Sequence, residues 1–213
     1  RVSPWGQLLL LAENLARPQG VAVDGDGNVY LTDTAASRIY RLAAGGAFAV
    51  FSEAVRNPAA ITVSTEGRGL FVADQGQTIW RLAADGGRAE RFAFLRDPGR
   101  PAGMALDEKG NLYVARDGGA QVSVLDPAGR VIDVFPIPGP RVTGVSFGGY
   151  DLKTLFISES STGALYKLEL PYRSQRLPWE PGGRLRITYP PDGAILNRHD
   201  GRQTPQGLQI TVQ

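Results

Sequence analysis

The sequence predicts an all-β fold of the β-propeller class, on two observations. The first is a segment that recurs four times in the 213 residues, with an aromatic residue at the same place in each copy: Tyr30, Phe71, Tyr113 and Phe156. These aromatic residues lie 41, 42 and 43 residues apart. The second is that each copy alternates apolar and polar residues with a period of two, whereas a helical period is sustained nowhere in the sequence. A period near 40 built from strands is typical of a propeller with one blade per copy.

Each copy divides into four expected strands. The innermost strand carries an apolar alternation: Val21 and Val23, Ile61 and Val63, Met104 and Leu106, Val145 and Phe147. A polar turn follows, with the sequences DGDGN, STEGRG, DEKGN and GGYDLK, which favour tight hairpins. The second strand has the sequences VYLTD, LFVAD, LYVAR and LFIS, and the third has RIYRL, TIWRL, QVSVL and ALYKL. The fourth has FAVFSEAV, AERFAFL and VIDVFPI, with the β-branched and aromatic residues that strands prefer.

The repeat also predicts the domain organisation. Residues 1–18 align without a gap with residues 41–58, so we expect the chain to begin inside a blade and to be part of a longer polypeptide. The last blade lacks a fourth strand of its own; residues 7–12 could supply it and close a ring of four, or further blades could enlarge the ring. We expect blades over residues 1–172, a linker rich in Pro, Gly and Arg over 173–184, and the start of an immunoglobulin-like β module over 185–213.

The composition excludes several classes of function. The 23 Lys and Arg residues against 21 Asp and Glu residues give a net charge of +2, and the charges are scattered, so no nucleic-acid partner is expected. No apolar run approaches the roughly 18 residues of a membrane span. The lack of cysteine removes disulfides, thiolate catalysis and cysteine-ligated zinc.

The run from Arg100 to Leu170 carries a family resemblance. The sequence PAGMALDEKGNLYVARDGGAQVSVLDPAGRVIDVFPIP is followed by VTGVSFGGYDLKTLFIS, in which Phe147–Phe156 fits the pattern FGG-x-D-L-x-T-L-[FY]. These residues resemble the senescence-marker-protein/gluconolactonase (regucalcin-like) family. Residues 7–172 as a whole resemble it more loosely, and also resemble NHL-repeat and strictosidine-synthase-like propellers. The resemblance implies a six-bladed propeller that hydrolyses sugar lactones with one calcium or zinc ion, which would polarise the lactone carbonyl at the channel mouth.

The family's metal ligands, carried over one by one, fall on residues that have no oxygen side chain. The Asp of the family's P-D-G segment falls on Ala102, and the Asn of its P/S-N-G segment falls on Ala59. A further family Asn falls on Gly144, and the family's Glu would precede Arg1. The matching place in the first copy holds Gln19, a weak ligand through its amide oxygen. We therefore expect no metal ligand, no cofactor and no catalytic residue of the family's kind.

Five residues are candidates for a ligand-binding channel mouth: Gln19, Asp33, Asp74, Arg116 and Glu159. The last four occupy the end of the second strand in successive copies, where a ring of charge could contact a ligand. The other interpretation is that a carboxylate there accepts hydrogen bonds from loop amides and holds the turn. Asp33 and Asp74 fit the loop-holding pattern, which Arg116 and Glu159 break. The DGDGN turn at residues 24–28 is interpreted as an ordinary hairpin rather than a calcium loop, and Trp80 as packing between blades.

Two functions are compatible with these features, and whether the protein is an enzyme stays open. The first is a non-catalytic, lactonase-like propeller that serves as a binding or scaffold module of a longer multidomain protein. Its ligand would be an unidentified small molecule, carbohydrate or protein. The second is a metal-dependent lactone or ester hydrolase, with calcium or zinc held by upstream residues or by non-family positions such as Asp74 or Glu159. The immunoglobulin-like start favours an extracytoplasmic bacterial protein, periplasmic or secreted, although the cytoplasm stays open.

Overall fold

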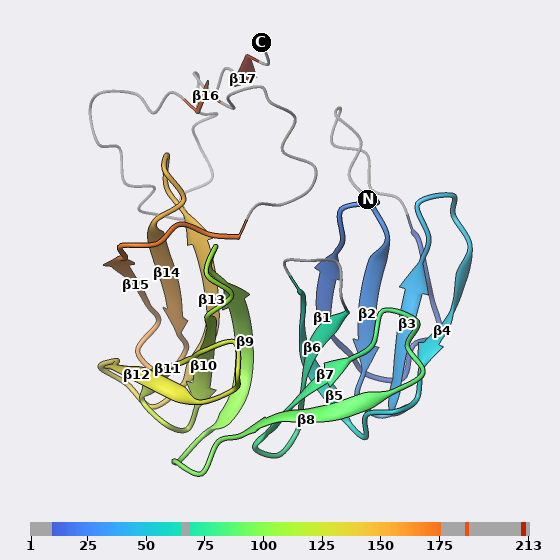
Figure 1. The fold of residues 1–213 in the computed structure, drawn as a ribbon, viewed down its shortest axis with the longest axis horizontal. Coiled ribbons are helices and arrows are strands. Elements are labelled where there is room, and N and C mark those ends of the chain that lie inside the picture. The colour runs from blue at the N-terminus through green and yellow to red at the C-terminus, as the bar shows by residue number, and fades with distance from the viewer. Residues whose placement is uncertain (1–9, 65–68, 176–185, 188–209, 212–213) are drawn as a thin grey trace, which may run out of the picture. The chain divides into compact units, whose positions relative to one another are not determined.

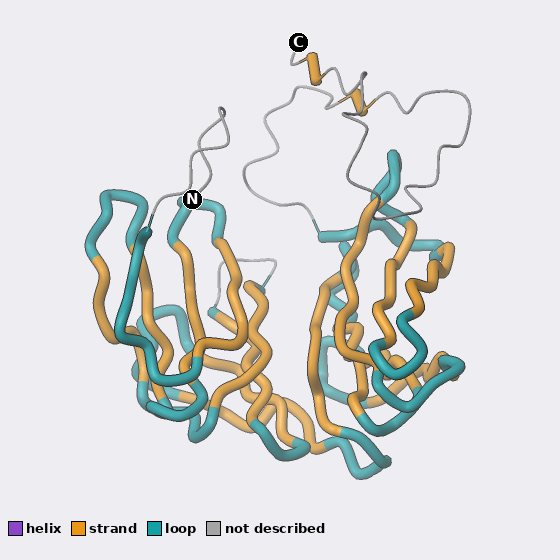
Figure 2. Tube along the Cα trace, turned by 180° about the vertical axis from the view of Figure 1, so that it is seen from behind, coloured by secondary structure: helices purple, strands orange, loops and turns teal. Residues whose placement is uncertain are grey.

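The computed structural model describes residues 10–64, 69–175, 186–187 and 210–211. The chain divides into two compact units, Arg1–Trp179 and Glu180–Gln213. The described residues of the first unit form strands joined by turns and loops, and no described residue is helical (Figure 2). The predicted all-β class is therefore confirmed. In the described part of the chain, no helix is long and apolar enough to cross a membrane.

The strands of the first unit form four antiparallel sheets, each in chain order (Figure 1). The first sheet holds β1 (Pro18–Val23), β2 (Val29–Asp33), β3 (Arg38–Leu42) and β4 (Phe48–Ser52). The second holds β5 (Pro58–Val63), β6 (Leu70–Asp74), β7 (Thr78–Leu82) and β8 (Ala89–Phe94). The third holds β9 (Arg100–Leu106), β10 (Leu112–Asp117), β11 (Gln121–Leu125) and β12 (Val131–Pro136). The fourth has three described strands, β13 (Val142–Gly148), β14 (Thr154–Glu159) and β15 (Ala164–Glu169).

Successive sheets contact one another through their innermost strands. β1 contacts β5, β5 contacts β9, and β9 contacts β13. Each of these strands begins with a register irregularity against its partner, which falls between Pro18 and Val21, Pro58 and Ile61, Pro101 and Met104, and Val142 and Gly144. The bulge therefore occupies the same place in every blade, at the end of the sheet where the innermost strand begins. Bulges re-aim side chains and often lie beside binding sites.

Three apolar clusters fill the space between successive sheets. Buried Val72 and Ile39 belong to the cluster between the first and second sheets, and partly buried Trp80 packs against it. The Nε1 group of Trp80 donates to Oδ2 of Asp74 over 3.1 Å. Further clusters join the second sheet to the third and the third to the fourth. The predicted packing role of Trp80 between blades is therefore confirmed, and apolar burial between sheets holds the blades together.

The second unit has two short described strands, β16 (Arg186–Ile187) and β17 (Ile210–Thr211), which pair antiparallel. The remainder of the expected immunoglobulin-like module lies outside the described residues. The same holds for residues 7–9 of the segment that could supply a fourth strand to the last blade. The linker and domain boundaries stay predictions.

Candidate functional site

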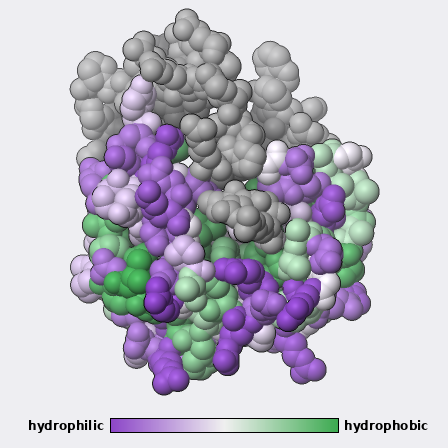
Figure 3. Space-filling view, in the orientation of Figure 1, coloured by the Kyte–Doolittle hydropathy of each residue, from purple (hydrophilic) through white to green (hydrophobic). Residues whose placement is uncertain are grey.

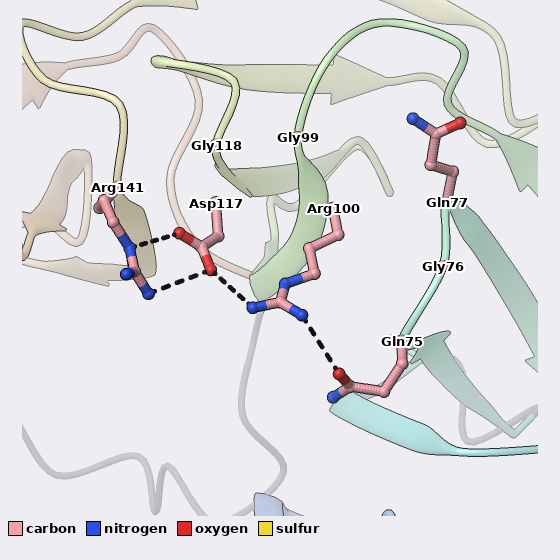
Figure 4. A pocket seen from close by; sticks show the side chains of 8 residues that line it. All are labelled: Gln75, Gly76, Gln77, Gly99, Arg100, Asp117, Gly118 and Arg141. Atoms are coloured by element: carbon pink, nitrogen blue, oxygen red, sulfur yellow. Dashed lines mark hydrogen bonds and ion pairs between the residues drawn. The ribbon is translucent and has the colours of Figure 1, made fainter.

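A hollow of about 570 Å³ lies where innermost strands begin and second strands end. It is lined by the loop after β6, the entry to β9, the end of β10 and the entry to β13: Gln75, Gly76, Gln77, Gly99, Arg100, Asp117, Gly118 and Arg141 (Figure 4). Hydrophilic side chains project at the lower edge of Figure 3, the edge at which the chain enters β9 in Figure 1. The hollow is shallow and open, and its lining of polar side chains and glycines differs from the mostly apolar lining of a typical small-molecule pocket.

Side-chain hydrogen bonds connect the first two sheets at this end. The hydroxyl of Thr34 lies 2.7 Å from Oε1 of Gln19 and 2.7 Å from the carbonyl oxygen of Pro58. Nε2 of Gln75 donates to the same Oε1 of Gln19 over 2.7 Å. Gln19 is exposed and belongs to the bulge of β1. Its amide oxygen therefore serves as a bridge between sheets.

The same series of contacts continues to the entry of the fourth sheet (Figure 4). Nη1 of Arg100 donates to Oε1 of Gln75 over 3.3 Å, and its Nη2 donates to Oδ2 of Asp117 over 3.2 Å. Arg141 donates to Asp117 from Nε over 3.0 Å and from Nη2 over 3.5 Å. We call the full series the polar chain: Thr34, Gln19, Gln75, Arg100, Asp117 and Arg141.

The charged end of the polar chain is only partly shielded from water. The Arg100 and Arg141 side chains are 50% and 55% exposed, whereas that of Asp117 is 11% exposed. Two guanidinium groups around one carboxylate leave the cluster with an excess of one positive charge. An excess of positive charge in a hollow favours an anion over a cation.

Two of the predicted site residues hold the loops beside them. Asp33 is fully buried and accepts hydrogen bonds from the backbone amides of Ala16, Arg17 and Ala36. Burial would raise the pKa of Asp33, but the hydrogen bonds from the loop amides outweigh it and hold the pKa below its ordinary value.

Glu159 has the corresponding role in the fourth sheet. This buried side chain accepts hydrogen bonds from the hydroxyl and amide groups of Ser161 and Thr162, and from the amide of Arg141. The hydroxyl groups of Ser161 and Thr162 contribute most to lowering the pKa of Glu159 to about 2. Both carboxylates therefore fit the loop-holding interpretation, while a ligand-binding role for them stays a prediction.

Arg116 replaces the carboxylate at the same place in the third sheet. Its side chain is fully buried, and Nη2 donates to the carbonyl oxygens of Asp97 and Gly99 over 2.6 Å each. Nε donates to the Gly99 carbonyl over 3.1 Å, and Nη1 to Oγ of Ser123 over 3.3 Å. Burial lowers the pKa of Arg116, with the Asp97 charge acting in the opposite sense. A carboxylate holds a loop through N–H groups, and this guanidinium holds one through carbonyls.

Asp74 lies closer to the surface than its counterparts. Besides Trp80, it accepts hydrogen bonds from the backbone amides of Gly76 and Thr78 over 2.8 and 3.2 Å. The turn it holds is the one that places Gln75 and Gln77 on the hollow. Of the five predicted residues, Gln19 is the one that belongs to the polar chain itself, and the ligand-binding role predicted for all five is not tested.

The DGDGN turn at residues 24–28 joins β1 to β2 as a hairpin, as the sequence predicts. Oδ1 of Asp24 accepts the amides of Asp26 and Asn28, and Oδ2 accepts the side chains of Asn28 and Tyr30. Asp107 makes the equivalent contacts in the third sheet, with Lys109, Asn111 and Tyr113. The repetition of this arrangement explains the turn sequences DGDGN and DEKGN without a metal ion.

Comparison with known proteins places the chain in a family. The family model described as "SMP-30/Gluconolactonase/LRE-like region" matches residues 11–161. The chain belongs to this family. The 6-deoxy-6-sulfogluconolactonase of Pseudomonas putida is 44% identical over 62 residues, which cover 29% of this chain and 21% of that protein. The aligned region is thus about a fifth of the length of this curated relative.

Solved structures extend the likeness of fold over most of the first unit. A gluconolactonase from Xanthomonas campestris superposes with a TM-score of 0.65 at 22% identity, covering 80% of this chain and 64% of that one. A chain of a nidogen/laminin complex superposes with a TM-score of 0.63 at 23% identity, covering 74% and 61% of the two chains. These likenesses show the propeller fold, which the family shares with proteins of other functions.

The residues at the family's metal positions do not fit a metal ion. Ala59 and Ala102 lie in the bulges at the start of β5 and β9, where their methyl groups offer no ligand. A Cβ atom on Gly144 would lie 2.8 Å from Oγ of Ser158, so a longer side chain would have to displace that serine. Among the described residues, no three His, Asp or Glu side chains gather closely enough to hold a metal ion.

The charged end of the polar chain was missed by sequence reasoning. Arg100 is the first residue of β9, Arg141 directly precedes β13, and Asp117, the last residue of β10, directly follows Arg116. Successive residues of a strand point to opposite sides, so the neighbour of a buried loop-holding residue is the one that faces the hollow. Listing the residues that follow the recurring charged position would have added Thr34, Gln75 and Asp117 to the candidates, but not Arg100 or Arg141.

Proposed function

We propose that this member of the gluconolactonase-like family is a ligand-binding propeller that does not carry out the family's metal-dependent hydrolysis. The observation that carries the proposal is the lack of oxygen ligands at Ala59 and Ala102, in the bulges at the start of β5 and β9. An alanine cannot coordinate a metal ion, and water in place of two protein ligands would leave little affinity. Without the ion, nothing at these positions polarises a lactone carbonyl.

The polar chain supports a binding role in place of that chemistry. Hydrogen bonds fix the side chains of Arg100 and Arg141 around Asp117, and their half-exposed edges stay accessible from the hollow. Preorganised groups of this kind bind a ligand at low entropic cost. The fold is compatible with a binding role, because this chain superposes with similar TM-scores on a gluconolactonase and on a chain of the nidogen/laminin complex.

A lactone hydrolase is the second candidate function. It is favoured by the 44% identity to 6-deoxy-6-sulfogluconolactonase over an aligned segment. Its ligands would have to come from elsewhere than the family positions. Asp74 and Glu159 are weak candidates for this, because their carboxylates already accept several hydrogen bonds from neighbouring loops.

Isothermal titration of the full chain with calcium, and separately with zinc, tests the proposal. We expect no saturable site tighter than about 10⁻⁴ M, a weak affinity for a natural calcium site. One saturable site per chain whose occupancy switches on lactone hydrolysis would overturn the proposal and favour the second candidate. The titration needs a chelator-treated sample, so that bound metal carried through purification does not mask the site.

A further inference from the structure

We propose that two copies of this chain associate head to tail, with the outer face of the fourth sheet of one copy packed on the outer face of the first sheet of the other. The proposal is independent of the proposed function, because neither face includes a residue that lines the hollow. It assigns an interaction surface to each end sheet and a second copy as its partner.

The outer face of the first sheet is apolar across all four strands. Side chains of a strand alternate between its two faces, and Ala22 and Tyr30 belong to the cluster shared with the second sheet. The residues flanking them therefore turn away from the second sheet. Cross-strand pairing places eight apolar residues on this outer face, which we call the leading face: Val21, Val23, Val29, Leu31, Tyr40, Leu42, Phe48 and Val50.

The leading face has the residue pattern of a face that another sheet covers. The second sheet turns the corresponding residues, in the same cross-strand rows, towards the first sheet: Ile61, Val63, Leu70, Val72, Trp80 and Leu82. Val21 is 60% exposed, whereas its counterpart Ile61 is 7% exposed. A terminal repeat whose outer face stays in water carries polar residues there. An exposed apolar face of this size is instead typical of an interaction surface.

The outer face of the fourth sheet has the pattern that packs on such a face. We call it the trailing face, and its described residues include Ser146, Phe156, Ser158, Leu165 and Lys167. Leu165 is 70% exposed. The residues at its place in the first three sheets are fully buried in the clusters with the following sheet: Ile39, Ile79 and Val122. The trailing face thus repeats a buried face but lacks its cover.

One chain therefore carries both halves of a junction that it forms three times within itself. At the second junction, the guanidinium of Arg81 lies over the Phe71 ring at 5.4 Å, and Lys167 and Phe156 occupy the same two places on the trailing face. Because both end faces are exposed in one chain, each fits the opposite face of a second copy. A head-to-tail contact is heterologous, so further copies can add at the free faces or close a ring.

Analytical ultracentrifugation of the full chain tests the association. We expect a mass above that of one chain, increasing with concentration over about 1–100 µM, the range of micromolar association. Val21→Asp and Leu165→Asp each place a charge in one end face, and each is expected to raise the dissociation constant at least about tenfold. Ile132→Asp is the matched control, because Ile132 is 56% exposed on β12 of the third sheet and lies on neither end face.

Three results of this experiment would overturn the proposal. The first is an unmodified chain that stays monomeric over the whole concentration range. The second is self-association that either end-face variant retains at full strength. The third is an equal loss of self-association in Ile132→Asp.

A mixture of the two end-face variants tests the head-to-tail arrangement. Val21→Asp keeps an intact trailing face and Leu165→Asp an intact leading face, so an equimolar mixture is expected to form a complex of two chains and nothing larger. Neither variant alone is expected to form it. A mixture that stays monomeric while the unmodified chain associates would overturn the arrangement. Thermal unfolding checks that each variant folds, and Val21→Ser with Leu165→Ser replaces the pair if an aspartate variant does not.

Discussion

Arg141 and Asp117 are joined twice, by a side-chain contact of 3.0 Å between Nε and Oδ1 and by a β-bridge between their backbones. Beside them, the amide of Gly118 donates to the carbonyl oxygen of Pro140 over 2.7 Å. The third and fourth sheets are therefore connected at the hollow by backbone as well as by charge. Because the backbone holds this junction, the arginine side chains need not stabilise it alone.

Arg116 and its neighbour Asp117 are predicted to differ sharply in their contribution to stability. Arg116→Met leaves the Asp97 and Gly99 carbonyls without their buried donor and is expected to lower the free energy of unfolding by about 2–4 kcal/mol. Asp117→Asn weakens contacts to half-exposed arginines and is expected to cost about 0.5–1 kcal/mol. Urea unfolding of both variants measures the difference. Equal losses would contradict the burial-based account of these two residues.

The low pKa of Glu159 predicts that the folded state loses stability in acid. Its folded pKa of about 2 lies below the ordinary value of 4.5, so its contribution to stability is fully present above the ordinary pKa and is lost as the pH falls through the folded pKa. Urea midpoints measured between pH 6 and pH 2 should therefore fall less steeply for Glu159→Gln than for the unmodified chain. A steeper fall in the variant would show that this carboxylate is not the stabilised group.

Gly103 is predicted to be essential for the close approach of β9 and β13. A Cβ atom there would lie 2.8 Å from Cα of Gly144 and 3.0 Å from the nitrogen of Val145, and both obstacles are backbone. Gly103→Ala is expected to lower the free energy of unfolding by about 1–3 kcal/mol through overpacking. Gly45→Ala is the control, because nothing lies within 4 Å of its added Cβ atom. A Gly103→Ala variant as stable as this control would contradict the packing described.

Restoring oxygen ligands is predicted to restore affinity for a cation. The double variant Ala59→Asn with Ala102→Asp returns the family's residue types to two bulge positions. We expect its calcium or zinc affinity, measured by isothermal titration, to exceed that of the unmodified chain by at least about tenfold. Ala59→Asn with Ala102→Leu is the control, because leucine adds bulk without a carboxylate. Equal gains in both variants would show that the carboxylate at position 102 is not a ligand.

The blades were predictable from the sequence because their signals are local. Alternating β-branched and aromatic residues mark β3, β7, β11 and β15, and turns such as DEKGN set the register by hydrogen bonds within five residues. The packing role of Trp80 followed because its place recurs as Tyr40 and Tyr166. These features need no knowledge of distant parts of the chain.

The hollow was less predictable because its contacts join different blades. Gln19 and Gln75 are 56 positions apart in the sequence, and Arg141 and Asp117 are 24 apart. Each side chain of the polar chain has a partner in a neighbouring blade, and no local sequence pattern pairs Arg100 or Arg141 with Asp117. Hence the strand-end charges Asp33 and Glu159 were recognised, while the functional candidates Arg100, Asp117 and Arg141 emerged from the structure.

Hydrolysis of D-glucono-1,5-lactone by the full chain, followed as acid release with calcium or zinc added and again after chelation, tests the central claim most directly. We predict that acid release in the presence of the chain proceeds at the same rate as in the protein-free solution under both conditions. The reason is that Ala59 and Ala102 leave the family's metal positions without ligands. A saturable rate that requires the metal and disappears with the chelator would contradict the account.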